Sequence, residues 1–404
     1  MNIKQKLLTY ISNKWNSSTH RIDLEKIKFL NIGNDIKAIK QEQIDNQYKN
    51  CITELVNNCE DTYKSLLQVL LNNQLHRIQT DNINLIVNTG ASVIGTNLFL
   101  FRITADVVKR ISQLSCIVGI QPMTNPVGLL YKIQITDKPP IDQNISSKCI
   151  EIVSTAVEAR SRKLQAIINI ESIQDVKALH NIDIELEVQK ILVDEIAADI
   201  IADILHNIVK ISTPNIKTII HREDDDIQLH AKHILTAINR ASLQIATSSQ
   251  RGKGNIIICS PDSVTLLKQY LKLTAIHTVA FRPSHKPNIM SELAYAGDII
   301  TETGSTIYSV YSSTLSIFDI VGKSRFLIGY KSRVSEHDAG YYFCPYMPVI
   351  TTGIVIDQMT FAPKLGLMTR YGLHPTIEAN DYDNASNYYR IVDADLINML
   401  QIIA

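Results

Sequence analysis

The chain has 404 residues, of which 40 are basic and 40 acidic, so its formal net charge is zero. This balance excludes the strongly basic surface of a protein that binds nucleic acid non-specifically, and the length suits two or three domains. Hydrophobic residues make up 45% of the chain, enough for a buried core. No apolar run approaches the roughly 18 residues of a membrane span, and no signal peptide opens the chain. We therefore expect a soluble protein made in a cytoplasm.

The cysteines are scattered, at Cys51, Cys59, Cys116, Cys149, Cys259 and Cys344. No two of them have the CxxC spacing of a zinc ribbon or a thioredoxin-type site, and they do not form a disulfide framework. Buried free thiols in a reducing compartment are the expected state.

The first 54 residues differ in composition from the rest. They contain nine basic and six acidic residues, no proline and one glycine. Ile3, Leu7, Leu8 and Ile11 lie on one face of a helix. Two interpretations stay open: an ordinary helical subdomain, or a detachable segment that binds another protein.

A strand, a turn and a second strand are expected over 117–135, after a helix over 106–114. The turn contains Pro122, Pro126 and Gly128, which exclude a helix interior. Residues 129–135 then alternate between apolar and polar, as in a half-exposed strand. The polar residues 138–147 predict a projecting loop.

The strongest helical pattern covers 183–210. Its apolar residues form an unbroken i, i+4 row: Val188, Leu192, Ile196, Ile200, Ile204 and Ile208. Asp183 suits the N-cap. A helix of this length extends about 40 Å and typically spans a domain.

Strands and helices alternate after this helix, which indicates an α/β domain. The acidic run 223–226 suits either a cation site or a solvated loop. A helix over 227–248, a tight turn at 251–254, a buried strand over 255–259 and a helix over 261–273 follow. Further strands are expected over 306–311, 325–331, 341–350 and 366–371.

No group of residues carries a catalytic signature. His230 and His233 share a helix face but have no third ligand. His337 and Asp338 near Cys344 have no nucleophile elbow, and 251–254 lacks the spacing of a phosphate-binding loop. The sequence predicts no catalytic residue, no cofactor and no metal site, and a protein that acts through its surfaces.

Five blocks of sequence, in one order, resemble the major capsid protein of T-even-type tailed phages. They are 118–128, 156–164, 251–260, 329–346 and 369–372. Each block is short, but the ordered set is specific and covers about 118–372. The resemblance is weak over 55–115 and 273–325.

This resemblance implies an α+β chain with the HK97-like capsid fold. The expected divisions are a scaffold-binding, propeptide-like segment (1–54), an N-terminal arm (55–120), an extended loop and peripheral domain with the spine helix 183–210 (121–224), an axial domain (225–372) and a C-terminal return to the peripheral domain (373–404), with a strand over 388–392.

The implied function is a major capsid protein, not an enzyme, that self-assembles as hexamers or pentamers into the icosahedral or prolate shell enclosing a tailed phage's DNA genome. The implied location is the virion capsid, after synthesis in the host cytoplasm. Implied partners are other copies, a scaffold protein, a prohead protease, and vertex, portal and decoration proteins, with only non-specific contact to DNA. Two alternatives are the vertex paralog of the same family and a cytosolic α/β enzyme or binding module with an unrecognised site.

Two sets of site residues follow from the resemblance. The family's protease cuts after Glu in an Ile/Leu-x-Glu context, which Ile52, Thr53 and Glu54, followed by Leu55, satisfy. Residues 300–302 satisfy it too, but we expect them to be protected in the fold and 52–55 to form an exposed linker. The basic cluster Arg160, Arg162 and Lys163, beside the extended loop, is expected to make ion pairs between subunits or to form a solvated surface.

Overall fold

The structure is a computed structural model. It describes residues 46–59, 61, 63–82, 101–109, 111–137, 148–167, 171, 184–214, 227–273, 279–283, 293–301, 307–320, 323–333, 337–356, 362–377 and 384–395. Helices and strands are mixed through these residues, so the predicted α+β class is confirmed.

A small sheet of four strands has the order β1-β12-β13-β4. Its strands are β1 (Gly119–Ile120), β12 (Tyr341–Ile356), β13 (Pro363–Pro375) and β4 (Arg160–Ile167). β12 and β13 are antiparallel, and β13 pairs with β4 on its other side. The sheet therefore joins segments that are far apart in the sequence.

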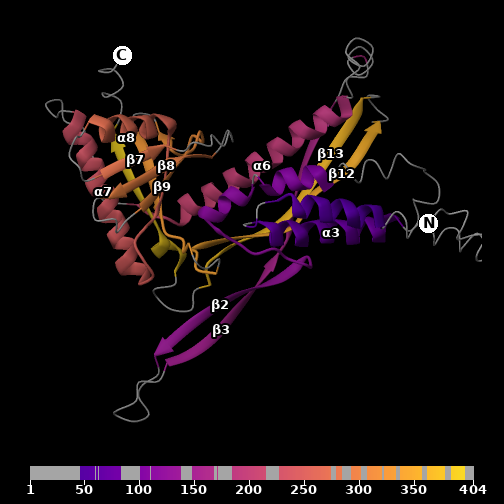
Figure 1. Cartoon of the computed structure of the whole chain (residues 1–404), viewed down its shortest axis with the longest axis horizontal. Coiled ribbons are helices and arrows are strands. Elements are labelled where there is room, and N and C mark those ends of the chain that lie inside the picture. Colours follow the sequence, from indigo (N-terminus) through magenta and orange to yellow (C-terminus); the bar gives the residue numbers. More distant parts are fainter. Residues whose placement is uncertain are drawn as a thin grey trace, which may run out of the picture.

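The long helix α6 (Ile184–Ile211) packs along this small sheet (Figure 1). The predicted apolar row faces the core, and burial increases along it, from a partly buried Val188 to a fully buried Ile208. Its 28 residues give a length of about 42 Å. The predicted helix is confirmed, whereas its predicted N-cap, Asp183, lies outside the described residues.

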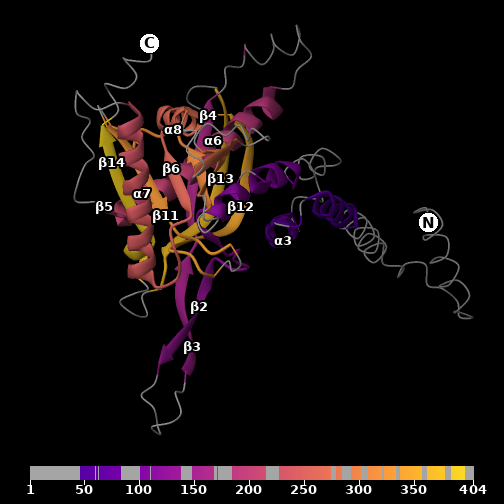
Figure 2. The same ribbon diagram turned by 60° about the vertical axis from the view of Figure 1, so that its left-hand side comes forward.

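A large sheet forms the second half of the molecule, in the order β5-β14-β11-β6-β9-β8-β7, with β10 paired to β11. Its strands are β5 (Thr213–Pro214), β14 (Tyr389–Asp395), β11 (Lys323–Gly329), β6 (Ile256–Cys259), β9 (Ile307–Ser312), β8 (Ala294–Thr301), β7 (Val279–Pro283) and β10 (Asp319–Ile320). Helices α7 (Ile227–Ser249) and α8 (Pro261–Leu273) cover one face (Figure 2).

Strand β6 is buried on both faces of the large sheet. Ile257 and Cys259 pack with α7 and α8, while Ile256 and Ile258 belong to the core that contains α6. An uninterrupted apolar run is what a strand between two covered faces requires. The predicted buried strand over 255–259 is confirmed for this reason.

A hairpin of β2 (Val127–Asp137) and β3 (Lys148–Glu158) projects away from both sheets (Figure 1). The loop expected over 138–147 lies outside the described residues. Strand β1 pairs with β12 rather than with β2, so the proline-rich turn carries the chain from the small sheet into the projecting hairpin.

Helices near the amino-terminus lie on the side of the molecule away from α7 and α8 (Figures 1 and 2). Residues 46–57 and 101–109 are helical, α3 covers Lys64–Asn82, and the 3-10 helix η2 covers Ser112–Cys116. Tyr48, Leu67, Leu71 and Phe101 form a separate buried cluster here. Tyr48 and Phe101 meet edge to face, with ring centroids 5.6 Å apart.

Two predicted divisions differ from the observed sheets. The segment 341–372, expected in the axial domain, belongs to the small sheet with α6, because β13 pairs with β4 over eight residues. The C-terminal strand β14, expected to return to the peripheral domain, instead pairs with β11 in the large sheet. In both cases, pairing with a strand that is distant in the sequence determines the sheet to which the segment belongs.

Candidate assembly surfaces

The projecting hairpin has one apolar face that is open to solvent. Val127, Leu129 and Tyr131 are 58%, 50% and 47% exposed, and Ile152 across the hairpin is 70% exposed. Leu129 lies opposite Ala156, and Tyr131 opposite Ser154. Side chains opposite one another share a face of an antiparallel pair, so these residues form a contiguous surface, here called the hairpin face.

The opposite side of the hairpin is packed at its root. Leu130 and Val157 are buried with Met123, Tyr342 and Cys344. Backbone hydrogen bonds fasten the same region: the Ala159 amide donates to the Pro126 carbonyl at 2.8 Å. The hairpin therefore has an anchored root and a free apolar face.

Helix α3 closes the edge of the small sheet with side-chain amides. Asn73 Nδ2 donates to the carbonyls of Met123 (2.7 Å) and Tyr346 (3.0 Å). The buried Gln74 donates to the Val349 carbonyl at 3.3 Å and accepts from the Thr104 hydroxyl at 2.7 Å. Backbone groups on an unpaired strand edge need such partners. The sequence analysis did not predict this role, although three consecutive amides, Asn72, Asn73 and Gln74, stand in the middle of the helix.

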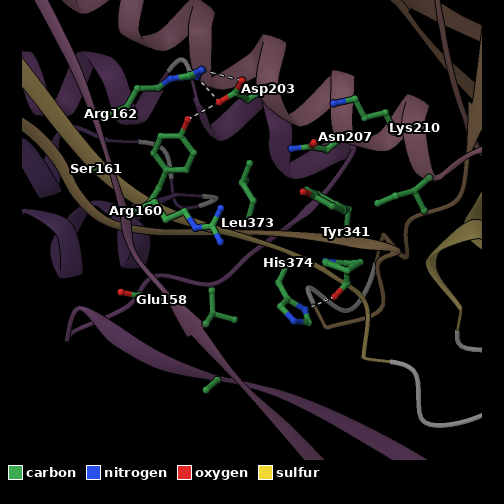
Figure 3. Close-up of a pocket in the computed structure, with 15 residues that line it drawn as sticks. Glu158, Arg160, Ser161, Arg162, Asp203, Asn207, Lys210, Tyr341, Leu373 and His374 are labelled. Carbon is green, nitrogen blue, oxygen red and sulfur yellow. Dashed lines mark hydrogen bonds and ion pairs between the residues drawn. The ribbon is translucent and has the colours of Figure 1, made fainter.

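The basic cluster is divided by the alternation of β4. Arg162 faces α6, where its guanidinium forms a bidentate ion pair with Asp203; the longer contact, Nη2 to Oδ1, is 3.0 Å (Figure 3). The Tyr371 hydroxyl also donates to Asp203, at 2.9 Å. Burial, together with the hydrogen bond to Asp203 and the charge of that carboxylate, raises the pKa of Tyr371. Arg162 thus has a partner within its own chain.

Arg160 and Lys163 remain exposed on opposite faces of β4. Arg160 lines a cavity of about 730 Å³ between β4, the end of α6 and the adjoining ends of β12 and β13 (Figure 3). Lys163 projects from the face of the small sheet that is turned away from α6. These two residues are the members of the predicted cluster left without a partner among the described residues.

The predicted cleavage residues lie in a helix, not in a linker. Ile52 is 7% exposed and packs in the amino-terminal cluster, while Thr53 and Glu54 are exposed and Leu55 is half-buried. The Thr53 hydroxyl donates to the Lys49 carbonyl at 2.8 Å. The linker expected at 52–55 is therefore wrong, although Thr53 and Glu54 are exposed as expected. Of the second match, Ile300 and Thr301 lie in β8, and Glu302 lies outside the described residues.

The cysteine state is mixed. Cys259 and Cys344 are buried as expected, Cys51 and Cys59 are half-buried, and Cys116 is exposed. Burial raises the pKa of Cys344 to about 12, which disfavours the thiolate that a nucleophile needs.

The aromatic residues Tyr341, Tyr342 and Phe343 are buried in the core.

The other residues considered as possible sites in the sequence either have a packing or surface position or lie outside the described residues. The turn over 251–254 brings Gly252 close against the Tyr330 ring. The acidic run 223–226 lies outside the described residues, as does the side chain of His230, whereas His233 is exposed on α7. Within the described part of the chain, no group of three His, Cys, Asp or Glu residues could hold a metal ion. No described helix is long and apolar enough to cross a membrane.

Known proteins similar to this chain are capsid proteins. The "Major capsid protein" of Enterobacteria phage T6 is 28% identical over 243 residues, which cover 54% of this chain and 44% of the relative. That of Enterobacteria phage T4 is 28% identical over 242 residues, covering 54% and 42%. The chain therefore spans less than half the length of these relatives.

A similar solved structure is "The capsid of Myoviridae Phage XM1", with a TM-score of 0.38 and 9% identity, covering 70% of this chain and 90% of that one. Residues 140–394 match the family described as "Major capsid protein Gp23". That match extends from the far end of the hairpin through α6 to β14, more than half of the chain. The chain belongs to the Gp23 major capsid protein family.

Proposed function

We propose that this protein is a shell-forming subunit that assembles with copies of itself into the capsid of a tailed phage. The main observation in support of this proposal is the exposed, apolar hairpin face. A two-stranded hairpin is marginally stable alone in water, and this one exposes Val127, Leu129, Tyr131 and Ile152 together. Burying what remains exposed of each side chain contributes about 1 kcal/mol.

Repetition makes such modest contacts sufficient for a shell. Each subunit in a ring uses its hairpin face once and receives a neighbour's once, because the contact is heterologous and closes by rotation. The contacts then act together through multivalency. Family membership supports the same role.

The partners proposed for this subunit are those of a capsid precursor: a scaffold protein, a prohead protease, and vertex, portal and decoration proteins. Cleavage after Glu54 belongs to this proposal. Because Ile52 is buried in a helix, the protease would act only after that helix opens locally. A mature amino-terminus at Leu55, measured by mass spectrometry of purified shells, supports this step; an intact Met1 in mature particles contradicts it.

Assembly itself is tested by producing the full chain with its scaffold and separating particles by sedimentation. Closed shells seen by electron microscopy are the expected product. A defined small oligomer as the sole species, with no shells at any concentration or with any scaffold, would contradict the proposal. In shells that form, reconstruction shows whether the subunit occupies hexamers or vertices.

A further inference from the structure

The cavity beside Arg160 lies where the hairpin meets the small sheet. The start of β4, the last turns of α6, and the adjoining ends of β12 and β13 line a half-open cavity of about 730 Å³. Figure 3 shows Arg160 reaching toward this space from β4 and Lys210 lying along α6, with Asn207, Tyr341 and His374 around the space. This volume is much larger than a single small anion would fill.

The charges lining the cavity do not cancel. Arg162 and Asp203 satisfy one another, and Tyr371 adds a hydrogen bond to the same carboxylate. Arg160 and Lys210 are both exposed and have no hydrogen bond or ion pair to any described residue. Glu158 is the one other carboxylate in the lining. The lining therefore contains two cations, Arg160 and Lys210, and one acid, Glu158, for which no ion pair with a described residue is found.

The rest of the lining suits an acidic side chain with an aliphatic stem. Leu373 and Ile211 supply apolar surface, and the Asn207 amide supplies a neutral donor. Charge-assisted hydrogen bonds from guanidinium and ammonium groups to a carboxylate are stronger than neutral ones. A partly enclosed site screens them less than open solvent does.

We propose that this cavity is a docking site for an acidic segment of a second copy of the chain, whose carboxylates pair with Arg160 and Lys210. The inference rests on the proposed function, because only an assembled shell brings a neighbour to the cavity. The site adjoins Ala156 and Glu158 of β3, the root of the hairpin face. A neighbour that covers the hairpin face therefore lies next to the cavity. Exposed carboxylates such as Glu195 and Asp262 are available on this chain.

Zero-length coupling tests the contact directly. Shells are assembled from an equal mixture of nitrogen-15-labelled and unlabelled full-length protein, treated with a carbodiimide, digested and read by mass spectrometry. The expected product joins Lys210 to an Asp or Glu across labelled and unlabelled copies in shells, and is absent from unassembled subunits. Coupling of Lys210 only within one copy, or none in shells, overturns the inference.

Charge variants give an independent measurement. Arg160→Glu with Lys210→Glu is expected to lower the assembled fraction on the order of tenfold while leaving the Tm of the unassembled subunit unchanged. Arg160→Lys with Lys210→Arg keeps the charges and should assemble normally, as should the exposed control Lys323→Glu. Undiminished assembly of the double Glu variant overturns this inference and leaves the proposed function standing. Failure of the unmodified chain to assemble overturns the proposed function.

Discussion

Gly372 of β13 lies so close to Val157 of β3 that a Cβ atom at Gly372 would overlap the Val157 Cγ1 atom. The Glu158 carbonyl oxygen is the next neighbour, at 3.1 Å. This close approach brings the root of the hairpin against the small sheet. The absence of a side chain at 372 therefore helps to set the direction in which the hairpin leaves the molecule.

Gly372→Ala should displace the hairpin root and destabilise the subunit by about 1–3 kcal/mol, the usual cost of overpacking. Val157→Ala removes the methyl groups that the new Cβ would meet. Combined with Gly372→Ala, it should restore part of the lost free energy of unfolding, although alone it destabilises the protein by leaving a cavity. Denaturant unfolding of the four proteins measures the coupling. Strictly additive losses would show that the two sites do not meet.

Leu129 and Leu130 are neighbours in sequence but lie on opposite sides of the hairpin, 50% and 2% exposed. Leu129→Ser should leave the Tm of the subunit almost unchanged and reduce assembly, because it alters only the hairpin face. Leu130→Ser should cost about 2–4 kcal/mol of stability, since it removes a buried apolar side chain. Thermal unfolding and sedimentation separate these effects. Normal shell formation by Leu129→Ser would remove the hairpin face from the interface.

Gln74 links the α3 helix to the edge of β12 and to Thr104. Gln74→Ala leaves the Val349 carbonyl and the Thr104 hydroxyl without these partners, at a cost of about 1–3 kcal/mol. Gln68→Ala changes an exposed residue of the same helix and should fall within about 0.5 kcal/mol of the unmodified chain. Urea unfolding of both variants makes the comparison. Equal stability of the two would mean that the amide contacts to β12 contribute nothing.

The elements that sequence predicted best are those specified by local patterns. The row from Val188 to Ile208 defines α6 because an i, i+4 repeat describes one face of one helix. The apolar run at 256–259 defines β6 for the same local reason. The linker predicted around Glu54 was wrong, because that prediction depended on a change in amino-acid composition. Tyr48, Ile52 and Val56 at i, i+4 spacing were the signal for the helix found there.

Sheet membership and side-chain partners were not available from local patterns. Strands β4 and β13 pair although almost half the chain separates them. An alternation of apolar and polar residues predicts a strand, but it does not predict which strand it pairs with. Arg162 belonged to a basic cluster in sequence, but only the fold brings Asp203 and Tyr371 to it. The cavity was missed for the same reason, because Arg160 and Lys210 are on different elements.

Cys344 gives a pH dependence with a defined sign. Its pKa rises from 9.0 to about 12 because the thiol is buried, beside Met123, Leu130 and Val157 at the hairpin root. The unfolded chain loses this proton near pH 9, whereas the native protein keeps it to about pH 12. The stabilising contribution is therefore complete below pH 9 and is lost as pH rises from 9 to 12.

Cys344→Ala isolates that contribution, because tyrosines such as Tyr342, whose pKa burial raises to about 12, titrate in the same range in both proteins. The free energy of unfolding of the unmodified chain should fall more steeply with pH, by up to about 1.4 kcal/mol per pH unit. Denaturant unfolding at pH 8, 9, 10 and 11 measures the two slopes. A thiol reagent at pH 8 should label Cys116 at once and Cys344 only after unfolding. Parallel slopes with rapid labelling of Cys344 would place its thiol in solvent rather than in the packed root of the hairpin.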